Sequence, residues 1–132
     1  MGVACKLSCG HCSYHQNVFL GIGFRYIDLD SILEWYEEEE GRQRIKEFRG
    51  DQKTTFHCYD GLYVCPECNY LLNHVYLHMQ SETKSYTNRY ICPRCNTKMP
   101  TEPLLEEIKS GVLDCPDCKQ EKLVVAFYMD WD

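Results

Sequence analysis

The hydrophobic positions of this chain change their spacing several times, and each change predicts a different element. Residues 17–27, NVFLGIGFRYI, are rich in β-branched and aromatic residues, which predicts a strand with a centre weakened by glycine. Residues 62–79, LYVCPECNYLLNHVYLHM, place alternating apolar positions on both sides of a tight turn, which predicts a hairpin. Residues 122–129, KLVVAFYM, predict a further strand near the end of the chain.

A helical pattern lies between the first strand and the hairpin, in the segment DLDSILEWYEEEEGRQRIKEFRG. Its acidic residues precede its basic ones, an order that suits the helix dipole, and Gly50 is a suitable end. We therefore expect a helical insert at about residues 29–50, with Gly41 as the candidate point of division into two shorter helices. The apolar residues that can pack on one face are Ile32, Leu33, Trp35, Tyr36, Ile45 and Phe48.

Ten cysteines in 132 residues change this picture, because eight of them form four Cys-x-x-Cys steps. The start of the chain lacks the basic and apolar regions of a secretory signal, so we expect a cytoplasmic protein whose thiols stay reduced. In that setting, thiols at short fixed spacing predict metal ligands rather than disulfides. A redox dithiol is disfavoured, because no βαβ pattern surrounds any of the four steps. The predicted ligands are Cys9, Cys12, Cys65, Cys68, Cys92, Cys95, Cys115 and Cys118.

The two C-terminal steps are separated by 19 residues, a spacing typical of one four-thiolate zinc site. The steps at 9–12 and 65–68 are then left to form the second site across a 52-residue interval. Loop closure costs grow only with the logarithm of length, so that interval is tolerable. Cross-braced and nested pairings of the four steps are the alternatives. Asn69 and Asn96, which follow two of the steps, predict left-handed residues at those turns.

Three other residues are alternative metal ligands. Cys5 competes with Cys9 for the first site, and Cys58 with its neighbour His57 is a candidate for a further site. The commoner role of an isolated thiol is that of a small buried side chain. The sequence therefore predicts two structural zinc ions as the cofactors. Cys5, Cys58 and His57 are kept as alternative metal ligands.

The charge of the chain disfavours one class of partner. Its formal charge is −6, and two four-thiolate zinc sites would bring it to about −10. Non-specific nucleic-acid binding depends on Lys and Arg, so another protein is the favoured partner. The residues assigned to partner binding are Glu37, Glu38, Glu39, Glu40, Arg42 and Arg44. A solvated helix face is the commoner use of such a run of charges.

No set of residues predicts an enzyme. Four thiolates fill the shell of a zinc ion, whereas catalytic zinc keeps an open position for water. The chain has no constellation of a nucleophile with its base. We therefore expect a non-enzymatic adaptor or regulatory protein that acts through protein–protein interaction, without a membrane span. The alternatives are a zinc ribbon that binds single-stranded RNA or DNA through its aromatic residues, and an acidic inhibitor that mimics nucleic acid.

The CPRC and CPDC steps with their flanking residues resemble the zinc-ribbon superfamily over residues 90–129. The order of the whole chain resembles that of small bacterial proteins with two zinc ribbons. This resemblance implies two four-thiolate zinc sites at the eight positions and carries no activity. The expected fold is thus a small, metal-stabilised α+β protein, with a first ribbon at residues 1–80 that holds the helical insert and a compact second ribbon at residues 88–132.

Overall fold

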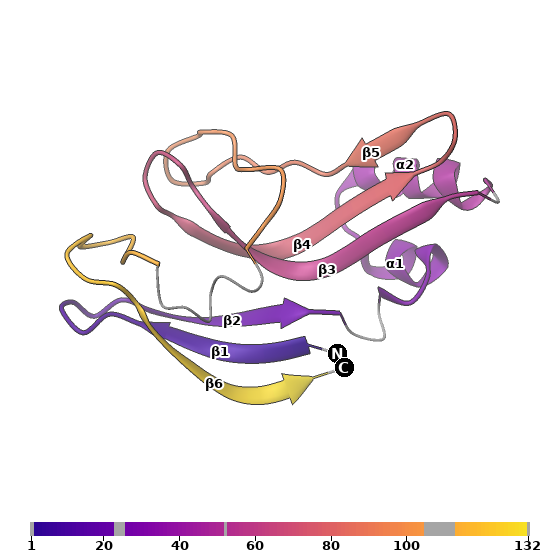
Figure 1. Cartoon of the computed structure of the whole chain (residues 1–132). Helices are drawn as coiled ribbons and strands as arrows, with labels where there is room; N and C mark the ends of the chain where they lie inside the picture. The colour runs from indigo at the N-terminus through magenta and orange to yellow at the C-terminus, as the bar shows by residue number, and fades with distance from the viewer. Residues whose placement is uncertain (1, 23–25, 52, 105–112, 132) are drawn as a thin grey trace.

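The computed structural model describes residues 2–22, 26–51, 53–104 and 113–131, which form an antiparallel sheet and two helices (Figure 1). Hydrogen bonds join the strands in the order β5–β4–β3–β2–β1–β6. The first and last strands of the chain are therefore neighbours. In chain order, the elements are β1 (Gly2–Ser8), β2 (His15–Gly21), α1 (Leu29–Trp35), α2 (Glu39–Arg49), β3 (Thr55–Val64), β4 (Leu71–Gln80), β5 (Ser85–Thr87) and β6 (Val124–Trp131).

The predicted fold of two separate zinc ribbons in an α+β protein is wrong, because one six-stranded sheet runs through the described residues. Strand β6, which the sequence assigned to a compact C-terminal ribbon, pairs along its length with β1. The prediction failed because it omitted strand β1, which is the strand that β6 pairs with. Val3, Cys5 and Leu7 alternate along β1, and the last two are fully buried, so β1 can lie between two other strands.

Several smaller predictions are confirmed. The hairpin at residues 62–79 exists as the adjoining parts of β3 and β4, and the C-terminal strand exists as β6. The first predicted strand is confirmed as far as Gly21; Ile22, Tyr26 and Ile27 lie outside any strand, and residues 23–25 of that prediction lie outside the described residues. Neither helix has the length and apolar character that a membrane span requires, within the part of the chain that the structure describes.

The sheet has a weak junction between β2 and β3. These strands share a single paired position, Gly21↔Asp60. The side-chain amide of Asn73 on β4 reaches across this junction, accepting from the N–H of Phe19 at 2.8 Å and donating to its carbonyl at 2.9 Å. Further along β3, Leu104 exchanges two backbone hydrogen bonds with Leu62. A side chain and a single backbone position thus replace a regular strand ladder here.

The predicted helical insert is confirmed, but it divides at residues 36–38 and not at Gly41. The carboxylate of Glu38 begins α2 by accepting from the N–H of Gly41 at 2.8 Å. Gly41 lies inside α2 against the ring of Tyr36, where an added Cβ would come within 2.2 Å of a ring carbon. A glycine is required at position 41 because the ring of Tyr36 approaches it closely. The division between the two helices lies before Gly41, at residues 36–38.

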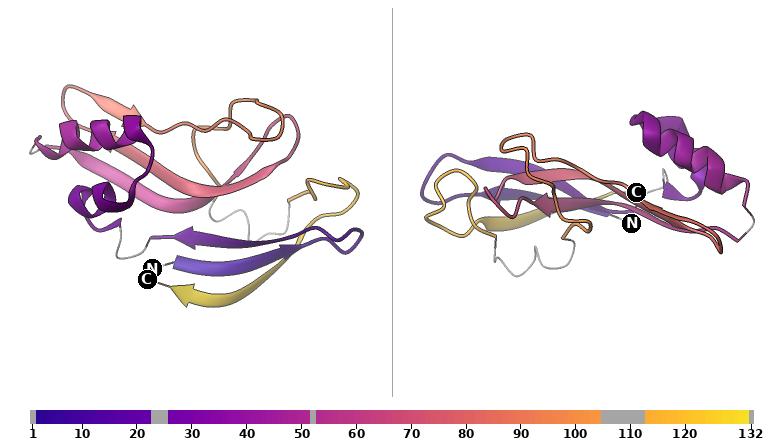
Figure 2. Two further views of the ribbon diagram at one scale, coloured as in Figure 1. Left: turned by 180° about the vertical axis from the view of Figure 1, so that it is seen from behind. Right: turned by 90° about the horizontal axis from the view of Figure 1, so that it is seen from above.

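Two distinct regions of core lie at the two ends of the sheet. The helices cover one face of β3, β4 and β5 at the end away from the β1–β2 and β3–β4 turns (Figure 2). Ile32, Ile45 and Phe48 pack there against Leu77 and Met79. The remaining core surrounds the cysteine-bearing turns at the opposite end. The helices therefore cover the core at one end, and cysteines together with apolar side chains form it at the other.

Candidate metal centres and an adjacent pocket

Each Cys-x-x-Cys step lies on a turn between two antiparallel segments. The steps at 9–12 and 65–68 form the tips of the β1–β2 and β3–β4 hairpins. The steps at 92–95 and 115–118 lie on short hairpins, each closed by one isolated β-bridge. Such turns present two sulfurs in one direction, as a shared metal ion requires.

A left-handed residue follows the second cysteine of three turns. The φ angles are 63° at Asn69, 66° at Asn96 and 56° at Lys119. Each of these residues donates its N–H to the carbonyl of the first cysteine of its turn, at 2.9–3.1 Å. The predictions for the two asparagines are confirmed. Lys119 was missed, because lysine is not enriched in this conformation as asparagine is.

Four cysteines form what we term the outer cluster: Cys9, Cys12, Cys115 and Cys118. The Sγ atoms of Cys9 and Cys118 are 3.6 Å apart, and those of Cys12 and Cys115 are 3.5 Å apart. All four sulfurs lie within 4.8 Å of one another. The backbone N–H groups of His11 and Cys12 point at the sulfur of Cys9, at 3.3 and 3.4 Å. His11 thus contacts the outer cluster through its backbone N–H, and its imidazole is not part of that cluster.

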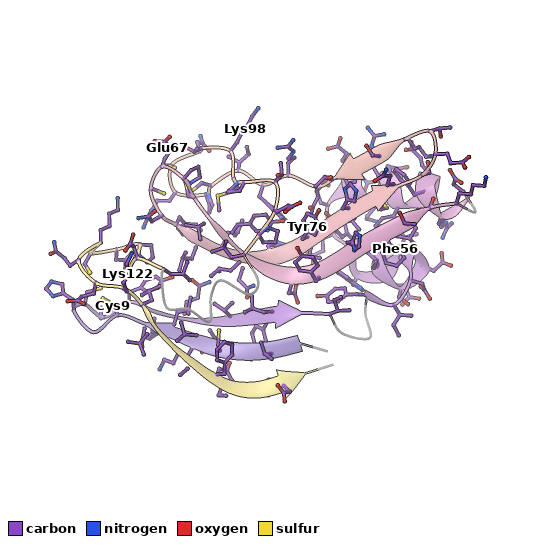
Figure 3. The ribbon with its side chains drawn as sticks, in the orientation of Figure 1. Cys9, Phe56, Glu67, Tyr76, Lys98 and Lys122 are labelled. Atoms are coloured by element: carbon purple, nitrogen blue, oxygen red, sulfur yellow. The ribbon has the colours of Figure 1, made fainter. Side chains whose placement is uncertain are left out.

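The other four cysteines form the inner cluster: Cys65, Cys68, Cys92 and Cys95. The Sγ atoms of Cys65 and Cys95 are 3.4 Å apart, and those of Cys68 and Cys92 are 3.6 Å apart. The hydroxyl of Thr97 lies 3.2 Å from the sulfur of Cys95. Both clusters lie at the same end of the molecule, as the labels on Cys9 and Lys122 and on Glu67 and Lys98 show (Figure 3).

The predicted pairing of neighbouring steps is wrong. The first step joins the fourth, and the second joins the third, so the inner cluster is nested within the chain segment that the outer cluster closes. The cause is the pairing of β1 with β6, which brings residues 115–118 beside residues 9–12. The 19-residue spacing of the two C-terminal steps, typical of one zinc site, therefore misled the sequence prediction.

The geometry of both clusters fits a tetrahedral metal ion. Zinc with Zn–S bonds of ~2.3 Å needs neighbouring sulfurs about 3.8 Å apart, close to the spacings in both clusters. The same spacings are far longer than the ~2.05 Å bond of a disulfide, and all ten cysteines are free thiols. Four sulfur donors select soft ions such as zinc and leave no ligand position open. All eight predicted ligands thus lie in two clusters that could hold metal ions.

Both clusters contain a thiol whose pKa is lowered from the ordinary value of cysteine. Burial opposes ionisation of Cys68, but hydrogen bonding from Arg94, from the N–H of Tyr70 and from the neighbouring thiols outweighs it and lowers the pKa of Cys68 to about 6. Burial also opposes ionisation of Cys115, whose pKa is lowered to about 7 by the N–H groups of Cys118 and Asp117. Thiolates are the metal-binding form of cysteine, so each cluster has a ligand prepared at neutral pH.

Arg94 connects the two clusters, and the sequence prediction missed it. This residue lies in the CPRC turn of the inner cluster, and its guanidinium donates to the carbonyl of Cys68 at 2.6 Å and to that of Pro116 at 2.9 Å. It also lies 3.5 Å from a carboxylate oxygen of Asp117, in the CPDC turn of the outer cluster. The sequence did contain a signal for this contact, because the third residues of the two turns, Arg94 and Asp117, have opposite charges.

The three alternative ligands lie elsewhere. Cys5 and Cys58 are buried within strands, and burial is the main reason that the pKa of Cys58 is raised to about 12. The imidazole of His57 stacks on that of His78, with ring centroids 6.5 Å apart. Neither of the two clusters found among the described residues includes any of these three.

The charges assigned to partner binding fall into two groups. Arg42 is committed within the chain, because its guanidinium donates to the carbonyls of Leu33 and Tyr36 and so covers the end of α1. Arg44 pairs with Glu47 at 3.5 Å and lies over the ring of Tyr86. The glutamates, namely Glu37, Glu38, Glu39 and Glu40, are all exposed, and so is Arg44.

A pocket of about 630 Å³ begins beside this acidic run. Its wall contains four aromatic residues, and the side chain of Asn88, 4% exposed, donates to the hydroxyls of Tyr36 and Tyr90 at 3.0 and 3.2 Å. The hydroxyl of Tyr26 donates to Asp60 at 2.6 Å. The lining residues come from the segment before α1, from α1, the following turn, β3, β4 and the segment after β5: Tyr26, Trp35, Tyr36, Glu37, Glu38, Asp60, Asn73, His74, Val75, Asn88, Arg89 and Tyr90.

Comparisons of the chain with protein-family models, with curated proteins and with solved structures find no match. The likeness to zinc ribbons therefore rests on the two four-cysteine clusters, and membership of that superfamily stays a prediction. The chain is a metal-binding candidate with two four-thiolate sites joined by one sheet.

Proposed function

We propose that this protein is a zinc-stabilised module that binds another protein at the pocket beside residues 37–38, and that it is not an enzyme. Zinc is the ion that four thiolates in a tetrahedral arrangement favour among the common divalent metals. A shell filled by four sulfurs holds structure together and offers no position for a substrate or an activated water. The metal then stabilises the sheet on which the binding surface is built.

The pocket is the observation that carries this proposal. Its floor is a fixed network, because Asn88 donates to Tyr36, to Tyr90 and to the carbonyl of Val75, and accepts from the N–H of Leu77. A pocket with a prearranged wall costs little ordering entropy when a ligand enters. Aromatic residues supply contact area at such sites, and they are enriched among residues that dominate binding energy.

The charge around the pocket favours a basic side chain of the partner. Three of its lining residues are acidic, namely Glu37, Glu38 and Asp60, against the single arginine Arg89. A lysine or arginine side chain can lie against aromatic rings while its charge faces carboxylates. The proposed occupant is therefore a lysine or arginine of a partner protein, presented from an exposed segment.

No specific observation favours nucleic acid as the partner. In the basic segment at 42–49, Arg42 covers the end of α1, and the exposed residues Arg44 and Arg49 form surface ion pairs with Glu47 and Asp30, the latter at 3.0 Å. The formal charge of −6 opposes binding to phosphates.

A peptide titration tests the proposal. The metal-loaded protein, labelled with ¹⁵N, is titrated with the five-residue peptides Gly-Ser-Arg-Ser-Gly and Gly-Ser-Lys-Ser-Gly, blocked at both ends, and with the same peptide carrying Gln at the centre. We expect saturable shifts of the Trp35 indole signal with the basic peptides and none with the Gln peptide. Glu37→Gln should weaken binding severalfold, because an exposed carboxylate at the mouth of the pocket is removed.

Glu34→Gln is the matched control, since Glu34 is exposed on α1 but does not line the pocket. It removes the same charge from the same region and should leave the affinity unchanged. Equal shifts with the Gln peptide, or no shift with any peptide, would contradict the proposal. So would a salt-dependent shift with single-stranded RNA in place of the peptides.

A further inference from the structure

We infer that the two metal sites load in a fixed order, the inner cluster before the outer one, and that Arg94 couples the second binding step to the first. The inference rests on metal binding by both clusters and does not depend on the proposed protein partner. Three independent features of the described residues support it: the lengths of the chain segments that the clusters close, the residues that pack around each cluster, and the contacts of one guanidinium.

The first feature is the nested connectivity. Between its two steps the inner cluster closes 23 residues, from Cys68 to Cys92, whereas the outer cluster closes 102 residues, from Cys12 to Cys115. For a flexible chain, the statistical weight of closure falls as the 3/2 power of the segment length. The statistical weight for closing the inner site is therefore about tenfold larger than that for closing the outer site. Once the inner site has formed, much of the longer segment is already folded, so the outer site closes at a lower cost.

The second feature is an asymmetry in packing. The apolar residues around the inner cluster all come from positions 63–99, with Tyr63 and Met99 at the two limits. By contrast, the core around the outer cluster includes Leu62 and Leu71 from the β3–β4 hairpin. The described surroundings of the inner cluster are thus local, whereas the outer cluster packs on strands that the inner cluster holds together.

The third feature is Arg94, the positioning residue between the sites. Metal binding at Cys92 and Cys95 fixes the turn that carries Arg94. The guanidinium then presents donors to Pro116 and Asp117 of the outer turn, at 2.9 and 3.5 Å. Its charge also lies between two clusters that each carry a net charge of −2 when four thiolates hold one zinc ion. Arg94 therefore offsets their mutual repulsion as well as orienting the outer turn.

The order of loading can be measured on the unaltered chain. The reduced, metal-free protein receives one equivalent of zinc and is then alkylated briefly with N-ethylmaleimide, and the modified cysteines are mapped by mass spectrometry. We expect the species with one ion to be protected at the four inner cysteines and modified at the four outer ones. Protection of the outer cysteines, or equal protection of both sets, would overturn the order.

The coupling needs a variant and a measurement of both stepwise constants by competition with a chelator. Arg94→Ala should weaken the second constant relative to the first by about tenfold, the size of one charge-assisted hydrogen bond. Arg94→Lys keeps the charge and should recover part of the effect. The matched control is Lys98→Ala, which removes a charge from an exposed position of the same hairpin and should leave the ratio unchanged.

An unchanged ratio of the two constants in Arg94→Ala would overturn the role of Arg94.

Cobalt provides a second readout of the order of loading, because the absorption of its thiolate complexes reports tetrahedral geometry at each site separately in variants that keep one cluster. A Cys9→Ser/Cys115→Ser variant should bind one ion with the first constant of the unaltered chain. A Cys65→Ser/Cys92→Ser variant should bind its ion at least tenfold more weakly than the second constant. Equal binding by both variants would contradict the inferred order.

Discussion

At the scale of single residues, the side-chain amide of Asn73 takes the place of backbone hydrogen bonds where β2 and β3 separate. It pairs with both polar groups of Phe19 and also donates to the carbonyl of Gly61 at 2.9 Å. An asparagine amide has the same donor and acceptor geometry as a peptide group, so it can extend a ladder by one position. The connection between the two halves of the sheet, β3–β4–β5 and β2–β1–β6, therefore depends strongly on this residue.

We expect Asn73→Ala to lower the free energy of unfolding by about 1–3 kcal/mol, because three backbone groups lose a partner. Denaturant unfolding of the metal-loaded protein measures the effect. Asn17→Ala is the control, since Asn17 is exposed on the neighbouring strand β2, and its loss should cost less than about 0.5 kcal/mol. Equal stabilities of the two variants would contradict the role assigned to Asn73.

Residue identity predicted which cysteines gather into clusters better than it predicted how their Cys-x-x-Cys steps pair. The eight cysteines, and the left-handed asparagines at 69 and 96, follow from local turn chemistry that sequence alone specifies. Arg94 and Asp117 meet only because two distant turns come together. Their opposite charges at equivalent turn positions were visible in the sequence, but nothing local selects one partner turn over another.

At the scale of elements, the contact between α1 and α2 is controlled by Gly41 and Tyr36. The ring of Tyr36 lies where a side chain at position 41 would be, and Arg42 covers the carbonyls at the end of α1. The sequence placed a division at Gly41 because glycine weakens helices. In the structure, the absence of a side chain at Gly41 instead makes room for the ring of Tyr36, a contact that is visible only in the packed structure.

Gly41→Ala should therefore destabilise the protein in spite of its better helix propensity. Overpacking costs about 1–3 kcal/mol, and the gain in propensity returns up to about 1 kcal/mol. Gly50→Ala is a suitable comparison, because the nearest atom to its added Cβ is 3.8 Å away. Thermal unfolding followed by circular dichroism should show a lower midpoint for Gly41→Ala and little change for Gly50→Ala. The reverse order would contradict this packing.

The same tyrosine makes the helical end of the sheet sensitive to alkali. Burial, with a smaller effect of Glu38, raises the pKa of Tyr36 to about 12 despite the hydrogen bond from Asn88. The folded state thus holds this proton more tightly than the unfolded state, whose tyrosine pKa is near 10. Its contribution is fully present below pH 10 and is lost as the pH rises toward 12.

Unfolding free energies measured at pH 9, 10, 11 and 12 should accordingly fall, and Tyr36→Phe should show a shallower fall than the unaltered protein. Absorbance of tyrosinate at each pH identifies when ionisation occurs. A fall of equal slope in Tyr36→Phe would show that Tyr36 is not a source of the alkaline loss.

Among the strands, the sequence predicted β2, β4, β6 and the end of β3, whose apolar patterns are long, and missed β1, β5 and the first part of β3. The buried positions of β1 include the adjacent residues Ala4 and Cys5, which do not stand out as hydrophobic in the sequence. That omission had a large consequence. Without a strand to receive β6, two separate ribbons were the simplest arrangement of the four cysteine steps.

At the scale of the whole molecule, one sheet carries helices at one end and two nested four-cysteine clusters, which could hold metal ions, at the other. The outer cluster joins residues near both ends of the chain, and β1 pairs with β6 beside it. Connectivity of this kind arises from long-range strand pairing, which local spacing does not encode. The number of sites was therefore predictable from the sequence, whereas their nesting was not.

Removal of the metal should unfold the end of the sheet that carries the clusters. Structural zinc contributes ~10–16 kcal/mol per site in small domains, which exceeds the stability of most domains of this size. Dialysis against a strong chelator under reducing conditions should abolish the cooperative thermal transition, and readdition of zinc should restore it. An unchanged melting curve after verified metal loss would contradict a structural role for the ions.

The nested pairing of the four cysteine steps is tested most directly by counting zinc ions in one variant. Cys9→Ser combined with Cys115→Ser removes two ligands from the outer cluster and none from the inner cluster. Native mass spectrometry should find one bound zinc ion in this variant and two in the unaltered chain. A variant that retains no zinc would mean that positions 9 and 115 serve different ions, and that result would contradict the nested arrangement.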